Sequence, residues 1–380
     1  MQFNFGEIIA NLNQRLPRSD NFAFKIARST TVPSDYILNT ILPQESRADF
    51  HIDGGTMTIT PTMLGQVPMD EPYPPFGSIE SSTFFENTTK LAGQIHLPEK
   101  TLRELYTWEQ NLIALGVQDG RTNGEIAADV NGRRLNTVLG FAQMITRAHW
   151  DTYEWLRGMA LTTGHLDWTF GKIPLNVDYN VPAGNIRTAR TGNDAYQGTT
   201  TKFWDDIRWL YTKLSNFRII MNSNTWYSII DNEANNIRVV VNEGFSREIV
   251  KIVGSVENNS SDVRDRVRVQ IYDKSGSVLK TDGSLAVKQF VPDGKIIVVG
   301  ETNPDGFEIE LGSSEDPNNT LRLGYTHIAP TVEGQMRPGI WSRIYTPQDK
   351  PMQVLGETAV NMLPVILNPK RLVILTTEVS

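Results

Sequence analysis

The C-terminal region, residues 290–380, constrains the fold more than any other part of the chain. It opens with the turn Phe290-Val291-Pro292-Asp293-Gly294-Lys295, which leads directly into the apolar run Ile296–Val299. Proline presets φ and glycine accepts a positive φ, so a Pro-Asp-Gly turn before β-branched residues predicts the start of a strand. The region closes on two more apolar runs, at 363–367 and 372–375. We therefore predict buried strands at both ends of this region.

The longest helical pattern runs from about Glu125 to Thr163, and Gly164 follows it as a stop signal. About thirty helical residues span ~45 Å, more than a compact domain needs, so we predict a helix that acts as a strut. A shorter helix is predicted from Pro98 to Gly116. The apolar faces of the two helices consist of Leu102, Leu105, Leu112 and Ile113 in the first and of Leu135, Val138, Ala142, Ile145, Thr152, Leu156 and Met159 in the second.

The N-terminal third lacks a long periodic segment. Residues 1–49 contain only short apolar pieces, which cannot bury much by themselves, and we interpret them as an arm that lies against another surface. Residues 50–97 predict two strands joined by a long excursion that holds Pro68, Pro72, Pro74, Pro75 and Gly77. A loop of this length inside a domain is usually functional or disordered, so it either contacts a neighbouring molecule or is disordered.

The middle of the chain alternates between helical and strand patterns, which indicates an α+β or α/β fold. An alternating strand is expected at 173–181, and a helix capped by Thr200 or Thr201 follows, with Asp205 and Asp206 in its first turn, where carboxylates suit the helix dipole. The apolar stripe of this helix consists of Phe203, Ile207, Leu210 and Leu214. After it we predict a strand at 217–221, a helix capped by Asn222 or Ser223, and a helical fragment at Phe245, Ile249 and Val253. The remaining predictions are strands at 267–272, 340–345 and 352–355, a polar loop at 258–262 and an exposed loop at 300–320.

Composition excludes several classes of protein. Hydrophobic residues make up 39% and charged residues 21% of the 380 residues, which is ordinary for a globular protein. The absence of cysteine excludes disulfides, thiolate metal sites and a cysteine nucleophile. A net charge of -7 without a long basic run argues against tight binding of nucleic acid. No secretory signal and no run of ~20 apolar residues is present, so we expect no membrane association.

Motifs for catalysis are weak or missing. The sequence has no phosphate-binding glycine loop and no Gly-x-Ser-x-Gly nucleophile elbow. His51 with Asp53 and His165 with Asp167 have a spacing that a metal site on a strand could use, but two ligands are too few and packing roles are favoured. We nominate no catalytic, cofactor-binding or metal residues and expect no cofactor. The tryptophans of the helical segments suit core packing better than a ligand platform: Trp150, Trp155, Trp204, Trp209 and Trp226.

The order of these segments resembles the major capsid (head) proteins of tailed phages with the HK-97-like fold, closest to the lambda-type major head protein family. The matching residues are Ala160-Leu161-Thr162-Thr163-Gly164 at the end of the strut helix, Val177-Asp178-Tyr179 before Pro182, the turn at 290–295, and the runs at 363–365 and 372–375. The resemblance covers most of the chain after about residue 30, and the order of the motifs carries it.

The resemblance implies an α+β HK-97-like fold: an N-terminal arm at 1–49, an extended loop at 50–97, a peripheral domain with a spine helix at 98–185 and 331–358, and an axial domain at 186–330 and 359–380. It implies a major capsid protein that forms pentamers and hexamers of itself and encloses double-stranded DNA. The expected partners are other copies, a portal protein, and scaffold and decoration proteins. Neither a cross-linking lysine–asparagine pair nor a long N-terminal scaffolding region can be placed, so we expect a separate scaffold or none.

Two other functions remain open at this stage. One is a different virion component, of a tail or a decoration, which would need β-rich repeats and no strut helix. The other is a soluble hydrolase that uses carboxylates, because the 43 acidic residues guarantee pairs by chance. For the head protein we expect a location in the virion, after assembly in the bacterial cytoplasm.

Overall fold

The computed structural model describes the chain in segments, and all structural statements below refer to these residues. They are residues 23, 26–27, 31–60, 78–97, 99–168, 175–214, 216–251, 266–279, 284–300, 307–311, 323–346 and 354–378.

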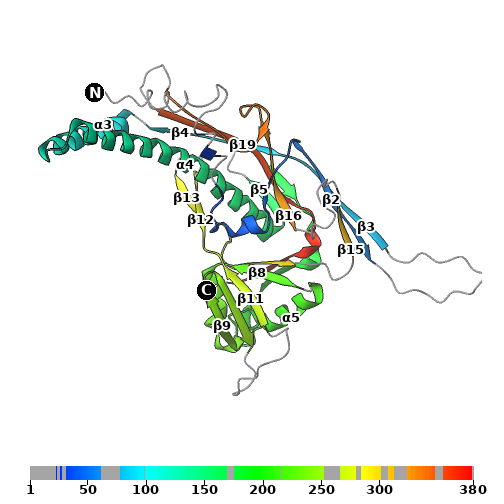
Figure 1. Cartoon of the computed structure of the whole chain (residues 1–380). Helices are drawn as coiled ribbons and strands as arrows, with labels where there is room; N and C mark the ends of the chain where they lie inside the picture. Colours follow the sequence, from blue (N-terminus) through cyan, green and yellow to red (C-terminus); the bar gives the residue numbers. More distant parts are fainter. Residues whose placement is uncertain are drawn as a thin grey trace, which may run out of the picture.

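The described helices are dominated by one long element. Helix α4 covers Asn123–Thr163, and Figure 1 shows it running from one side of the molecule into its centre. At its start, the Thr122 hydroxyl accepts from the Glu125 N–H while the Glu125 carboxylate accepts from the Thr122 N–H, a capping box that satisfies two free donors. At its end, Gly164 adopts φ 73°, a left-handed conformation that suits glycine. The other described α-helices are α3 (Glu99–Gln118), α5 (Phe203–Lys213) and α6 (Ser223–Ile230). The described 3₁₀ turns are η1 (Ile37–Thr40), η2 (Ala183–Asn185), η3 (Gly192–Asp194), η4 (Glu233–Asn235) and η6 (Pro369–Arg371).

A six-stranded sheet lies along one side of α4. Its central strand, β19, pairs with β4 on one edge and with β18 and β16 on the other, and β1 adds to β16 in parallel. The members are β1 (Gln44–Ser46), β4 (Thr89–Leu97), β16 (Gly324–Thr331), β17 (Arg337–Pro338), β18 (Trp341–Tyr345) and β19 (Val354–Ile366).

A seven-stranded sheet forms the lower body in Figure 1. Its order is β7 (Ile186–Arg190), β20 (Leu372–Thr377), β14 (Lys295–Gly300), β8 (Phe217–Met221), β11 (Arg266–Ile271), β10 (Ser246–Lys251) and β9 (Ile237–Glu243). Its middle is buried on both faces: on β14, Ile296 and Val298 pack with α5 and α6, whereas Ile297 packs in the core around α4. A strand covered on both faces reads as a continuous apolar run, which is why the Ile296–Val299 run predicted it correctly.

Three smaller sheets complete the described structure. The three-stranded sheet of β15 (Phe307–Leu311), β2 (His51–Thr60) and β3 (Ser78–Asn87) projects on the side opposite to α3 (Figure 1). The hairpins are β5 (His165–Trp168) with β6 (Leu175–Asp178), and β12 (Ser275–Leu279) with β13 (Leu285–Gln289).

Many predicted elements are confirmed with small shifts in their limits. The strand at 217–221 and the helix capped by Asn222 are present, and the Asn222 side chain accepts from the Thr225 N–H at 2.9 Å. The residue before α5 is Lys202 rather than either threonine, although the Thr201 hydroxyl accepts from the Phe203 N–H at 3.3 Å. Leu135, predicted on the buried face of the strut helix, is 37% exposed because α4 packs against the body only over its C-terminal half.

Three predictions are wrong. The predicted helical fragment at Phe245, Ile249 and Val253 is wrong where the structure describes it: Phe245 lies in the turn before β10 and Ile249 in β10, whose pairing with β9 and β11 overrides a local i, i+4 spacing, and Val253 lies outside the described residues. The loop at 300–320 contains strand β15, which pairs with β2. The separate strands at 352–355 and 363–367 are one strand, β19, which runs through Pro364. The proline is tolerated because pairing with β4 ends at Met362, and the Pro364 carbonyl instead accepts from the Tyr179 hydroxyl at 2.7 Å.

The four predicted domain ranges stay a prediction. Two of the predicted limits fall inside strands: the limit at 358/359 divides β19, and the limit at 330/331 divides β16, which pairs with β19. The polar loop at 258–262 and the proline-rich residues 68–77 lie outside the described residues.

Candidate assembly surfaces

The segment before β1 is fastened to the centre of the molecule. Strand β1 pairs in parallel with β16, and the Thr326 N–H donates to the Pro43 carbonyl at 2.7 Å. The Tyr36 hydroxyl donates to Asp151 on α4 at 2.7 Å, and Lys274 lies over the Tyr36 ring. The apolar residues of η1 join the main core, so this segment packs against the body of its own protomer, and the arm at 1–49 stays a prediction.

A sealed ion pair lies where this segment meets α4. The carboxylate of Glu154 and the guanidinium of Arg157 are 3.0 Å apart and almost without solvent contact. Glu154 also accepts from the Leu38 N–H at 2.7 Å and from the Tyr272 hydroxyl at 2.8 Å, while Arg157 Nε donates to Thr326 at 2.8 Å. Burial raises the pKa of Glu154, and the Arg157 charge and these hydrogen bonds oppose the rise. The cluster therefore links η1, α4, β16 and the residue after β11.

One edge of the β2–β3 hairpin is unpaired among the described strands. Its register runs from His51 opposite Asn87 to Thr60 opposite Ser78, and β15 covers the other edge of β2. Within the described residues, the outer edge of β3 has no strand beside it. Phe85 on this strand is 68% exposed. An open strand edge with an exposed aromatic residue can receive a strand from another chain.

Large apolar side chains are also exposed on other projecting elements. On α3 they include Leu115, which is 57% exposed, and on β13 both Leu285 and Val287 are about 70% exposed. Contiguous exposed apolar residues mark contact sites when they form a patch. The exposed large apolar residues on α3, on β13 and on the turn between β16 and β17 are Tyr106, Trp108, Leu115, Val117, Leu285, Val287, Val332 and Met336.

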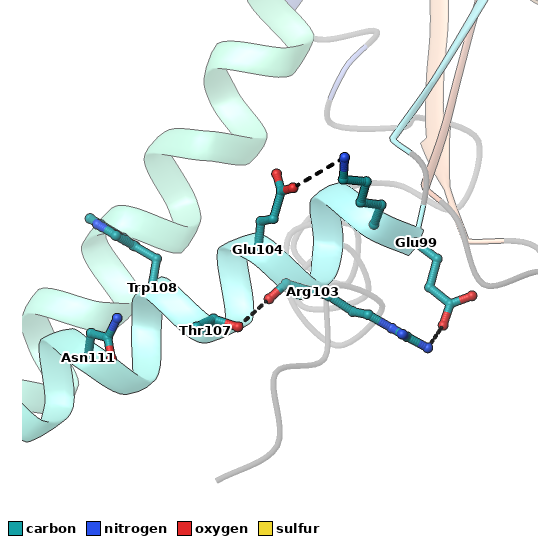
Figure 2. Close-up of a pocket in the computed structure, with 7 residues that line it drawn as sticks. Glu99, Arg103, Glu104, Thr107, Trp108 and Asn111 are labelled. Carbon is teal, nitrogen blue, oxygen red and sulfur yellow. Dashed lines mark hydrogen bonds and ion pairs between the residues drawn. The ribbon is translucent and has the colours of Figure 1, made fainter.

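A depression lies along helix α3. Figure 2 shows a depression of about 580 Å³ whose lining residues come from one face of α3. Its charged side chains pair with one another, Arg103 with Glu99 at 2.6 Å and Lys100 with Glu104 at 4.0 Å, and the Thr107 hydroxyl donates to the Arg103 carbonyl. These are ordinary i, i+4 pairs of a solvated helix face. The depression holds no nucleophile next to a base, which a hydrolase would need.

The two histidines with a spacing that a metal site could use have other neighbours. His165 lies 3.2 Å from Asp178, its partner on the neighbouring strand, and His51 contacts Asn87. No group of three or more potential ligands occurs in the described part of the chain. Across the same residues, no helix is apolar over a length that would span a membrane. Trp150, Trp155, Trp204 and Trp226 lie in the hydrophobic cores, as predicted.

The paired aspartates of α5 have separate roles that sequence spacing did not predict. Asp205 is exposed and lies 3.6 Å from Lys202, which fits a charge in the first turn. Asp206 is buried and is bound by Arg187, Arg190 and Tyr196. Two of these partners lie on strand β7, and no local pattern in the sequence indicates their contact with α5.

Comparisons with known proteins support the capsid fold. The chain is similar, over 100% of both chains, to a protein assigned as the capsid protein of a prophage of Escherichia coli CFT073, with 14% sequence identity and a TM-score of 0.53. A phage-related protein from Bordetella bronchiseptica RB50 matches at 13% identity and a TM-score of 0.44, over 94% of this chain and 96% of that one. An encapsulin complex from Synechococcus elongatus PCC 7942 matches at 10% identity and a TM-score of 0.42, over 93% and 92%.

No family model matches the sequence, and no curated protein matches it. At such low identity the first of these likenesses establishes the fold alone. The chain has an α+β fold of the HK-97-like capsid type, in which α4 is the long helix.

Proposed function

We propose that this chain is a major capsid protein that assembles into pentamers and hexamers, which form the icosahedral shell around the double-stranded DNA of a tailed phage. The observation that carries the proposal is the capsid fold over the whole length of the chain, shared with the prophage capsid protein of Escherichia coli. In this proposal residues 1–49 act as the arm, 50–97 as the extended loop, and the remaining ranges as the peripheral and axial domains.

The surfaces that the protomer leaves uncovered support self-assembly. The β3 edge and the helical projection of α3 leave the body on opposite sides (Figure 1), and β13 exposes Leu285 and Val287. A compact single-site enzyme gains nothing from such surfaces, because each exposes backbone or apolar area. In a ring of five or six copies every interface joins two different surfaces of the subunit, so projections on opposite sides can be used at once.

Net charge is consistent with a container for DNA. A subunit of charge -7 repels the phosphate backbone, so the enclosed DNA would be confined without tight binding. The partners in this proposal are other copies, a portal protein, and scaffold and decoration proteins, and the site of action is the virion after assembly in the host. The role is structural, without a catalytic site or a cofactor.

Negative-stain electron microscopy of the purified protein tests this function against the alternatives. Closed shells or rings of five and six subunits are expected for a head protein. Tubes or fibres would indicate a tail component, and small discrete oligomers of one size would favour a soluble enzyme.

A deletion of Pro68–Gly77 tests the role of the extended loop. We expect the deleted subunit to keep the thermal transition of the wild type but to lose shell formation, because the removed residues belong to the excursion beyond β2 and β3. In a second variant, a Gly-Ser segment of equal length replaces Pro68–Gly77, which keeps the length of the loop and removes only its side-chain contacts. Shells of wild-type appearance from both variants would contradict the loop assignment.

A further inference from the structure

Strand β7 carries two arginines that a bulge brings to the same side. Arg187 pairs with Leu375 of β20, and Arg190 pairs with Thr377, so three steps along β7 match two along β20. In a regular strand, residues three apart point to opposite faces. The bulge removes this alternation, and bulges at sheet edges often redirect a side chain in this way. Both arginines therefore reach the same residue, Asp206 on α5.

Asp206 holds both guanidinium groups in place. Arg190 binds the carboxylate with two donors, Nε at 2.8 Å and Nη2 at 2.6 Å, and Arg187 binds it through Nη1. The Tyr196 hydroxyl donates to the same carboxylate at 2.8 Å. Arg187 also stacks over the Trp209 ring at 3.8 Å. A carboxylate between two arginines reduces their mutual repulsion and fixes their side chains, as an orienting group does in an anion site.

The cluster keeps an excess of positive charge that solvent can reach. The Asp206 side chain is 3% exposed, whereas Arg187 and Arg190 are 31% and 33% exposed. One carboxylate faces two guanidinium groups, and Lys213 lies 5.9 Å from the Trp209 ring on the same helix. The Glu154–Arg157 pair differs, because one acid matches one arginine there and both are sealed. The β7 cluster thus has charge and donors that a further anion can reach, whereas the spine-helix pair is closed to solvent.

We propose that Arg187 and Arg190 bind the carboxylate of an aspartate or glutamate from a second copy of this chain. The inference rests on the proposed shell function. Strand β7 is the outermost strand of its sheet in the described residues, so a neighbouring subunit can approach it. Only about a third of each arginine is accessible, which suits one forked carboxylate contact better than a nucleic-acid backbone that needs many contacts in a row. Copies with 43 acidic residues supply the ligand in abundance.

The variant Arg187→Lys tests this contact by cross-linking. Lysine keeps the charge next to Asp206 and can form an amide with a carboxylate that a carbodiimide has activated. Subunits with natural and heavy nitrogen isotopes are mixed before assembly, the particles are treated with carbodiimide, and the peptides are read by mass spectrometry. We expect peptides that join position 187 of one isotope to an acidic residue of the other, present in particles and absent from separated subunits. Arg103→Lys, which lies beside Glu99 of its own helix, is the control for a link within one chain.

Several results would overturn the inference. Links from position 187 to Asp206 of the same chain alone would show that no second copy reaches the site. Reactivity of position 187 that rises only after nuclease treatment would assign the site to a phosphate group of nucleic acid. If Arg187→Lys fails to fold, Arg190→Lys replaces it, and phenylglyoxal labelling of wild-type Arg187, which we expect to be lost on assembly, gives a reading without any substitution. A chain that stays monomeric under all conditions would overturn the shell function as well, whereas particles without the link would overturn this inference alone.

Discussion

The two halves of α4 form one continuous helix in two different surroundings. Residues 141–163 lie in the hydrophobic cores and carry buried polar groups, including His149, Glu154 and Arg157. Among the described side chains of residues 123–140, Ile126, Val130 and Val138 are buried, and Arg133 lies over the Trp108 ring of α3. The outer half is therefore held by helix propensity, its capping box and the packing of α3, while the inner half is held by the body. Substitutions in the inner half should affect folding, and those in the outer projection should affect assembly.

The largest difference in the free energy of unfolding is expected between substitutions of one arginine in each half. Arg157→Ala leaves the Glu154 carboxylate buried without its partner, which typically costs about 3–5 kcal/mol in the free energy of unfolding. Arg133→Ala in the outer half removes only an exposed contact over the Trp108 ring, worth about 0.5–1 kcal/mol. Urea unfolding of the separated subunits measures both. Equal losses would show that the two halves do not differ in this respect.

His149 gives the inner half a dependence on pH. Burial lowers the pKa of His149 to about 4, from an ordinary value of 6.5. Thr358 donates its hydroxyl proton to the Trp341 carbonyl, so it accepts from the Nε2–H of a neutral His149 ring. Because the pKa is lower in the folded state, the stabilisation is complete above pH 6.5 and is lost as pH falls from 6.5 to 4, by up to about 3 kcal/mol. The measurement is the stability of the wild type minus that of His149→Gln, which should shrink over this window and stay constant above it.

Two glycines of α4, one in each half, are expected to change stability in opposite directions when alanine replaces them. A Cβ at Gly158 would lie 2.1 Å from the Phe290 carbonyl oxygen, a backbone atom, so Gly158→Ala should destabilise the subunit by about 1–3 kcal/mol. At Gly132 no atom lies within 4 Å, and Gly132→Ala should stabilise the helix by about 0.5–1 kcal/mol. Thermal unfolding followed by circular dichroism compares them. A stabilised Gly158→Ala would mean that α4 and the 290–294 turn do not approach this closely.

The smallest effect on folding is expected for the exposed apolar side chains of the outer projection. Leu115→Gln changes a side chain that is 57% exposed, so the stability of the subunit should stay within about 0.5 kcal/mol of the wild type. If a neighbouring copy covers α3, the same substitution should slow or weaken particle formation as measured by light scattering. Asn111→Gln, on the same helix, is the polar control. Unchanged assembly of Leu115→Gln would remove α3 from the set of contact surfaces.

Elements with strong local signals were predictable. The spine helix was predicted from its period and from Gly164, and strands β8, β14 and β20 from apolar runs that follow turn or cap residues. The inward stripe of α5 at Phe203, Ile207 and Leu210 is buried as its spacing predicts. The candidate assembly surfaces were foreseen only in outline, because a long loop and an arm can be read from proline content and broken periodicity.

Contacts between distant residues were not predictable. Strand β15 forms because β2 lies beside it, although the two are far apart in the sequence. Strand β10 has the spacing of a helical turn, yet two neighbouring strands satisfy its backbone. Asp206 resembled a simple helix-start charge, and only the bulge in β7 shows that two arginines reach it.

Local sequence and composition are enough to predict the capped helices, the strands buried on both faces, the absence of thiol chemistry and the acidic net charge, since each depends on residues close together or on composition alone. Which strands pair, which half of α4 is buried, and which acids meet which arginines depend on the folded chain. The physical reason is that backbone hydrogen bonds and charge pairs between distant segments form only after the chain brings these segments together, and one bulged residue or one missing neighbour changes which side chains meet.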